Sequence, residues 1–167
     1  MKAIRLATAW LSGCSGCHMS LLNLHQDLLE ILAQYDLAYS PLMDIKEYPD
    51  CVDIALVEGA VGNEDNREMA RIIRERTKIV ISLGDCAVNG NVSALRNPLA
   101  QGEEVRCSYG PPPENRSLAR LLPQVMPLHQ IIRVDAFIPG CPPDPAQIKD
   151  GLVNAQIRLT GFMAPQR

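Results

Sequence analysis

The chain has 167 residues, of which 47% are hydrophobic, 21% charged and only 4% aromatic, and its formal net charge is −3. A chain of this length buries a core without disulfide bonds, and no apolar run in it approaches the ~20 residues that span a bilayer. The negative charge and the scarcity of aromatic residues argue against a nucleic-acid-binding protein.

The first half of the chain alternates between strand and helix patterns. An apolar run at 3–11 predicts a buried strand, and leucines at mostly helical spacing predict a helix over 18–35. Residues 37–42 include a proline and predict a short strand near the sheet edge. A further strand is predicted at 52–59, and an amphipathic helix at 63–77 has acidic residues first and basic residues last.

The second half continues the alternation. Residues 78–84 form a β-branched, continuous strand pattern. A polar loop rich in proline and glycine is predicted at 97–115, a short helix at 116–122, a strand at 130–140 and a closing helix at 144–161. Alternating strands and helices predict a mostly parallel sheet covered on both faces. We therefore expect one α/β domain over 1–167.

Cysteines follow three of the predicted strands. The chain has six, at Cys14, Cys17, Cys51, Cys86, Cys107 and Cys141. Cys14 and Cys17 follow the first strand, Cys86 lies in "SLGDCA" and Cys141 in "IPGCPPD". Because the carboxyl ends of parallel strands share one edge of a sheet, these four thiols can converge there, where such folds bind ligands. Cys51 and Cys107 have no glycine-framed position after a strand, and we predict no role for them.

The stretch "LSGC" at 11–14 also resembles a bacterial lipoprotein cleavage site. The apolar segment between Arg5 and Cys14 is too short for a signal peptide, and it contains Thr8 and Ser12. We expect no lipid attachment and a cytoplasmic protein.

Four converging thiolates suit an iron–sulfur cluster or zinc. Structural zinc more often uses two close cysteine pairs, whereas only Cys14 and Cys17 form such a pair here. The spacing therefore favours iron–sulfur and leaves zinc open. A dithiol enzyme of the thioredoxin type would use "CSGC" alone and would leave Cys86 and Cys141 without a role.

Four ordered motifs carry a family resemblance. They are "GCSGCHMSLL", "VEGAV", "SLGDCAVNGNVSALRN" and "FIPGCPPDP". Over residues 4 to 155 the chain resembles the small subunit of nickel–iron hydrogenases, which is related to the 20-kDa iron–sulfur subunit of respiratory NADH dehydrogenase. It is most similar to the cytoplasmic NAD-linked bidirectional hydrogenases found in cyanobacteria. Adjacent cysteines mark the respiratory relatives, so the separation of Cys14 from Cys17 favours the hydrogenase branch.

The resemblance implies a flavodoxin-like three-layer sandwich with a cluster at the carboxyl ends of the strands. It implies that Cys14, Cys17, Cys86 and Cys141 bind one [4Fe–4S] cluster, and no cysteine follows Cys141 in this sequence to hold another. A flavin such as FMN is also conceivable in this fold. We do not expect FMN in this chain, because cysteines occupy the switch-point loop and no Ser/Thr-rich phosphate loop is evident.

The implied function is electron transfer. The cluster would relay electrons between the nickel–iron site of a large subunit and diaphorase subunits that carry flavin and further clusters. The whole complex would catalyse H2 + NAD+ = H+ + NADH, and the nickel–iron site would lie outside this chain. The alternatives are a 20-kDa-type subunit of another NADH dehydrogenase-like complex and a zinc-bound scaffold.

Several other residues have two interpretations each. Glu58 takes part in proton transfer or the large-subunit interface, or it is an ordinary carboxylate at a strand end. His18 either donates a hydrogen bond to a cluster sulfur or is a first-turn helix residue that faces solvent or a subunit, and we expect the second. Trp10 lies either in the core or at an interface, and we expect the interface. Asp85 is expected to be a turn residue. The 97–115 loop is expected to be ordered by a partner subunit.

Overall fold

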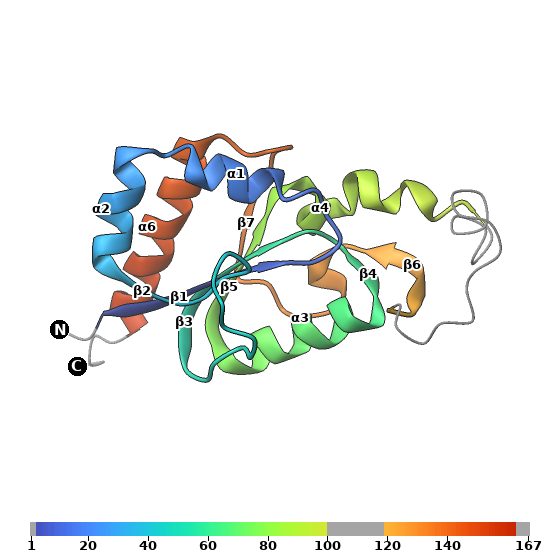
Figure 1. Ribbon diagram of the computed structural model, residues 1–167, viewed down its shortest axis with the longest axis horizontal. Coiled ribbons are helices and arrows are strands. Elements are labelled where there is room, and N and C mark those ends of the chain that lie inside the picture. The colour runs from blue at the N-terminus through green and yellow to red at the C-terminus, as the bar shows by residue number, and fades with distance from the viewer. Residues whose placement is uncertain (1–2, 100–118, 163–167) are drawn as a thin grey trace.

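The structure is a computed structural model that describes residues 3–99 and 119–162 (Figure 1). Its main sheet has five parallel strands in the order β2-β1-β3-β5-β7. They are β1 (Ile4–Trp10), β2 (Tyr35–Tyr39), β3 (Val52–Glu58), β5 (Thr77–Leu83) and β7 (Ala136–Ile138). Numbered along the chain within this sheet, the order is 2-1-3-4-5, which is the flavodoxin-like arrangement. The predicted fold class is therefore confirmed.

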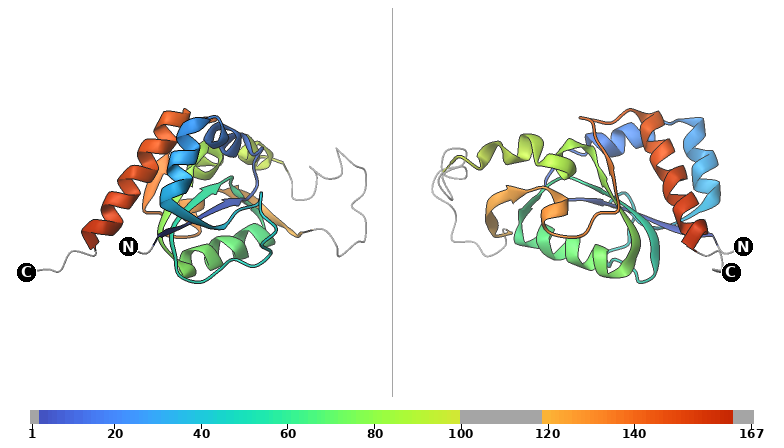
Figure 2. Two further views of the ribbon diagram at one scale, coloured as in Figure 1. Left: turned by 60° about the vertical axis from the view of Figure 1, so that its left-hand side comes forward. Right: turned by 180° about the vertical axis from the view of Figure 1, so that it is seen from behind.

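Helices cover both faces of the sheet and make three layers (Figures 1 and 2). They are α1 (Gly16–Leu22), α2 (Gln26–Gln34), α3 (Glu64–Arg76), α4 (Gly84–Asn89) and α6 (Pro145–Phe162). Apolar side chains alternate between the faces along each strand, because successive residues of a strand point to opposite sides. In β3, Ile54 and Leu56 pack toward α1, α2 and α6, whereas Ala55 and Val57 pack toward α3.

The N-terminal helix region differs from its predicted form. One helix was predicted over 18–35, but the structure has α1 and α2 with a break at 23–25. Asn23 closes α1, and its N–H donates to Met19 O and Ser20 O. His25 has a φ of 50°, in the left-handed region that a helix interior does not use. The leucine spacing detected both helices and could not detect the turn between them.

The segment after the undescribed residues also differs. A helix was predicted at 116–122, yet residues 121–122 begin β6 (Leu121–Met126), which pairs antiparallel with β4 (Val61–Asn63). Leu122 is buried in the core between the sheet and α3, and Pro123 has no N–H for a helical hydrogen bond. The strand predicted at 130–140 shortens to β7, because the 3-10 turn η2 (Leu128–Gln130) overlaps its first residue and residues 131–135 form turns, bends and irregular backbone.

The carboxyl ends of the strands define one edge of the molecule. The strand order reverses between β1 and β3, and the loop with Cys14 and Cys17 begins at that point. A second 3-10 helix, η1 (Asn91–Arg96), follows α4 along the same edge (Figure 1). In residues 3–99 and 119–162, no helix combines the length and the apolar character that a membrane crossing requires.

Candidate metal centre

Three loops bring the four predicted thiols to this edge. Cys14 and Cys17 lie between β1 and the first turn of α1, Cys86 lies in α4 directly after β5, and Cys141 follows β7. Their exposure is graded: Cys17 is buried, Cys86 is half-buried, and Cys14 and Cys141 are exposed. The group of cysteines therefore reaches from the interior of the domain to its surface.

The loops approach one another most closely at Gly84. Its φ is +78°, and a Cβ placed there would lie 2.2 Å from the sulfur of Cys17 and 3.4 Å from the carbonyl oxygen of Gly140. Only a residue without a side chain fits this position. The end of β5 thus packs directly on a thiol from the first loop and on the backbone that leads to Cys141.

The thiols also interact electrostatically. The pKa of the Cys17 thiol is raised to about 12, first by burial, then by the charge of Glu58, and then by Cys86, Cys14 and Cys141. Burial likewise raises the pKa of Cys86, with Cys141 and Cys14 adding to the shift. Burial and the neighbouring groups therefore disfavour the thiolate form of Cys17 and of Cys86.

This arrangement fits a group that carries positive metal ions. Iron–sulfur clusters are held by cysteine thiolates, one on each iron of a cubane, so the four sulfurs need not meet at one point. The metal charge would supply the compensation that the thiols lack. In the described part of the chain, no three His, Cys, Asp or Glu side chains are close enough to hold a single metal ion.

Glu58 ends β3 between the cysteine loops and is 2% exposed. Its carboxylate accepts hydrogen bonds from the backbone N–H of Cys17 at 3.3 Å and from that of His18 at 2.9 Å. It also lies 2.5 Å from His18 Nδ1. The first N–H groups of a helix have no partner within the helix, so Glu58 supplies one for α1 from a neighbouring strand.

His18 does not lie where it was expected. The sequence interpretation placed it toward solvent or a subunit, but it is 1% exposed. The prediction was wrong because α1 packs its first turn onto the end of β3, where Glu58 receives the imidazole. Trp10 contacts the His18 ring edge to face, with centroids 5.3 Å apart, and is itself 37% exposed. Whether Trp10 lies at an interface stays a prediction.

Replacement of Glu58 by glutamine should weaken the start of α1. The amide NH2 of glutamine would face at least one N–H that now donates to a carboxylate oxygen, which leaves a buried donor unsatisfied. We expect the free energy of unfolding to fall by about 1–3 kcal/mol, measured by chemical denaturation. Glu68→Gln on the exposed side of α3 is the control, and equal stability of the two variants would contradict this role.

The two remaining cysteines stay outside the group. Cys51 is exposed and directly precedes β3, at the amino-terminal edge of the sheet, on the side opposite the four thiols. Cys107, and residues 100–115 of the predicted loop, lie outside the described residues. The sequence analysis missed three polar side chains that join the cysteine loops by hydrogen bonds, namely Ser20, Asp85 and Ser93. Short polar residues occur in many kinds of turn and helix start, so their presence in a loop does not predict a bonding partner far along the chain.

The fold and site define a class: a parallel α/β domain that gathers four cysteines where the strands end. Residues 14–155 match the family model of the 20 Kd subunit of NADH ubiquinone oxidoreductase. The chain belongs to this family. It is 36% identical over 167 residues to the NAD-reducing hydrogenase HoxS subunit delta of Cupriavidus necator, covering 92% of this chain and 80% of that subunit.

Other relatives are longer. A subunit of the F420-non-reducing hydrogenase of Methanothermobacter marburgensis is 40% identical over 154 residues, which cover 85% of this chain and 50% of the relative. The chain spans about half the length of several such archaeal relatives. Among solved structures, a chain of an NAD+-reducing [NiFe]-hydrogenase in the H2-reduced state matches with a TM-score of 0.86 and 36% identity, over 96% of this chain and 93% of that one.

Proposed function

We propose that this chain is the electron-transfer small subunit of a nickel–iron hydrogenase and forms a single flavodoxin-like iron–sulfur domain over 1–167. One [4Fe–4S] cluster, bound by Cys14, Cys17, Cys86 and Cys141, would supply one-electron transfer. The observation that carries the proposal is the contact of three cysteine loops around Gly84, which packs against the sulfur of Cys17 and the carbonyl oxygen of Gly140. The similarity to hydrogenase subunits supports it independently.

The residues of this chain have distinct tasks in the proposal. The four cysteines bind as thiolates, and Gly84 leaves the space that the sulfur of Cys17 occupies. Glu58 holds the start of α1, and therefore Cys17, against the end of β3. We further propose that Glu58, through its contact with His18, takes part in proton transfer. H2 turnover by a Glu58→Gln complex that matches the wild type would exclude that part.

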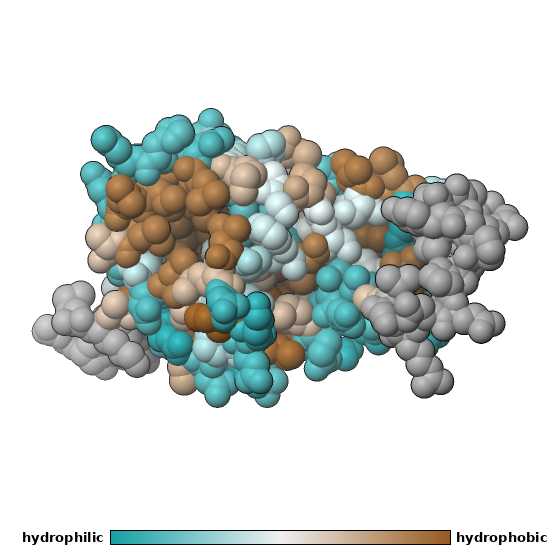
Figure 3. All heavy atoms as spheres, in the orientation of Figure 1, coloured by the Kyte–Doolittle hydropathy of each residue, from teal (hydrophilic) through white to brown (hydrophobic). Residues whose placement is uncertain are grey.

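The proposed partners are a large subunit with the nickel–iron site and diaphorase subunits with flavin and further clusters. Exposed apolar side chains beside the cysteine edge suit a subunit contact: Trp10 on β1, and Val92 and Leu95 on η1. Figure 3 shows apolar surface in the region of η1, apart from the larger apolar area over α1 and α2.

NAD is the proposed electron acceptor of the whole complex, supported by the similarity to the NAD-reducing hydrogenase subunit of Cupriavidus necator. The complex would then work in the cytoplasm, where the NAD pool lies. The archaeal relatives at 39–40% identity favour a second candidate with another acceptor. H2-dependent reduction of NAD+ by the purified complex separates the two, since only the first candidate forms NADH.

The cluster itself is tested by anaerobic purification of the chain, followed by iron and acid-labile sulfide analysis and by EPR after dithionite reduction. We expect about four irons and four sulfides per chain, with the signal of a reduced cubane. Stoichiometric zinc in a folded chain would favour the zinc scaffold instead. A folded chain without metal that reduces disulfides would favour the dithiol enzyme.

A further inference from the structure

Hydrogen bonds join the three cysteine loops in pairs. Ser20 Oγ in α1 donates to the carbonyl oxygen of Pro143 at 2.5 Å, which joins the first loop to the Cys141 loop. Ser93 Oγ in η1 donates to the carbonyl oxygen of Ser12 at 2.9 Å, which joins the segment after Cys86 to the first loop. The third link, between the Cys86 and Cys141 loops, is made by Asp85 and Gly140.

Asp85 makes this third link with both its backbone and its side chain. Its N–H donates to the carbonyl oxygen of Gly140 at 2.9 Å, and its carboxylate oxygen Oδ1 accepts from the N–H of Gly140 at 2.7 Å. Asp85 and Gly140 each directly precede a cysteine of the site. The two bonds therefore act one residue away from Cys86 and one residue away from Cys141.

The link matters because β7 is short and lies at the edge of the sheet. Only three residue pairs join β5 to β7, and the last is Leu83 with Ile138. Two residues beyond that pair, the N–H of Asp85 donates to the carbonyl oxygen of Gly140, so the two segments stay joined past the end of β7. The chain turns into α4 at this point, and the carboxylate provides the acceptor that a continuing β5 would have provided.

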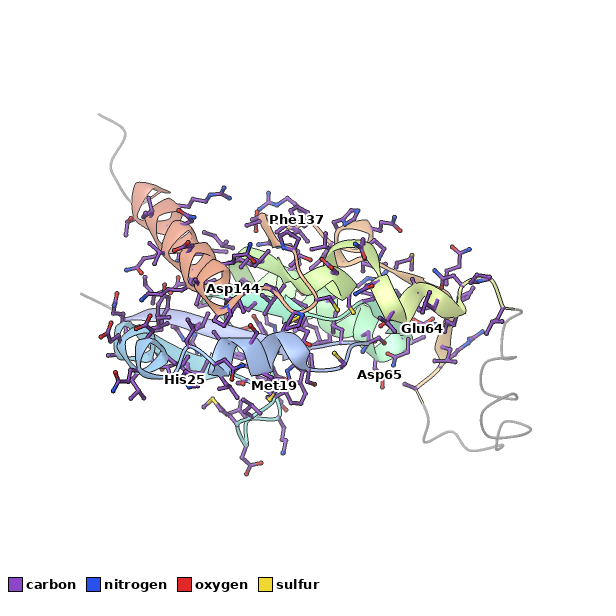
Figure 4. All side chains as sticks on the ribbon, turned by 90° about the horizontal axis from the view of Figure 1, so that it is seen from above. Met19, His25, Glu64, Asp65, Phe137 and Asp144 are labelled. Atoms are coloured by element: carbon purple, nitrogen blue, oxygen red, sulfur yellow. The ribbon has the colours of Figure 1, made fainter. Side chains whose placement is uncertain are left out.

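The opposite end of β7 is held in a similar way. The carboxylate of Asp135, just before β7, accepts from the N–H of Val80 in β5 at 2.8 Å, and its own N–H donates to Val80 O at 2.8 Å. Both ends of the short strand are thus fixed by an aspartate that bonds across to the neighbouring segment. The segment that leads to Cys141 runs between Phe137 and Asp144, which Figure 4 labels.

We propose that Asp85 is a positioning residue that sets the spacing of Cys86 and Cys141 before any metal binds. Without the carboxylate, the backbone after β7 would keep only one bond to the Cys86 loop, and the exposed Cys141 would lose its fixed position. Ordering a loop in advance lowers the entropy that binding would otherwise cost. The inference rests on the proposed function for the identity of the group that Cys86 and Cys141 bind.

The test compares three variants of the full chain, purified anaerobically. Asp85→Ala removes the acceptor, and Asp85→Asn keeps an oxygen that can accept from Gly140. Asp144→Ala removes an exposed carboxylate that caps α6 through Ala146 N and serves as the matched control near Cys141. The first readout is the rate at which a chelator removes iron. The second is hydrogen exchange of the Gly140 amide in the metal-free chain.

We expect Asp85→Ala to lose iron about tenfold faster than the wild type, as for other partners of metal ligands, and to exchange the Gly140 amide faster. Asp85→Asn and Asp144→Ala should resemble the wild type in both readouts. The inference would be overturned if Asp85→Ala kept iron as long as the wild type does. It would also be overturned if Asp144→Ala or Asp85→Asn lost iron as fast as Asp85→Ala. A wild-type chain that binds no iron would refute the proposed function, whereas the Gly140 exchange would still decide the role of Asp85.

Discussion

A Gly84→Ala variant should lose the metal centre and much of its stability. The new methyl group would lie 2.2 Å from the sulfur of Cys17, far inside contact distance, and the backbone φ of +78° disfavours any side chain. The strained backbone and the overpacking each cost about 1–3 kcal/mol, so we expect the free energy of unfolding to fall by about 2–6 kcal/mol. Chemical denaturation of the metal-free chain measures this, and iron analysis measures the loss of the centre.

Gly161→Ala is the matched control for Gly84→Ala. Gly161 lies near the end of α6, and a Cβ added there meets nothing within 4 Å. Because alanine favours a helix over glycine by about 1 kcal/mol, this variant should be as stable as the wild type or more stable. If Gly84→Ala kept wild-type stability and iron content, the close packing of Gly84 against Cys17 would be refuted.

Replacement of single cysteines should divide the six into two groups. Cys17→Ala and Cys141→Ala each remove one of four thiolates from the proposed cluster, and we expect iron to fall from about four per chain to below about one. Cys17 is buried and Cys141 exposed, so the two variants should differ in stability and agree in their loss of iron. Iron and sulfide analysis after anaerobic purification measures the result.

Cys51→Ala is the control for these substitutions. Cys51 is exposed, like Cys141, but lies at the amino-terminal edge of the sheet. Its removal should leave the iron content and the EPR signal unchanged. Full iron retention in Cys141→Ala together with loss in Cys51→Ala would reverse the ligand assignment.

The strand pattern made the main sheet predictable. Parallel strands that are buried on both faces need continuous apolar runs, and the runs at 3–11, 52–59 and 78–84 became β1, β3 and β5. The position of the cysteines after strands then predicted that they share one edge, since this depends only on strand direction. The structure places three cysteine loops at that edge, whereas the identity of the ligands stays a prediction.

Features that depend on distant contacts were not predictable. His18 looked like an ordinary residue of a first helical turn, and its burial depends on Glu58, forty residues further along the chain. The link between Asp85 and Gly140 spans fifty-five residues. Leu122 was assigned to a helix because local spacing does not reveal that β6 pairs with β4. In each case a tertiary partner decided the conformation, and no local pattern encodes it.

The position of β7 affects how the site is completed during synthesis. The segments that carry Cys14, Cys17 and Cys86 are made first, and they follow strands β1 and β5. These two strands are joined through β3, so β7 is not needed to bring them together. Cys141 arrives later, with the edge strand β7, and closing a contact over such a sequence distance is slow compared with local folding. A nascent chain can thus present three thiols well before the fourth. A site with all four cysteines in place would then indicate that the edge strand β7 has joined the sheet.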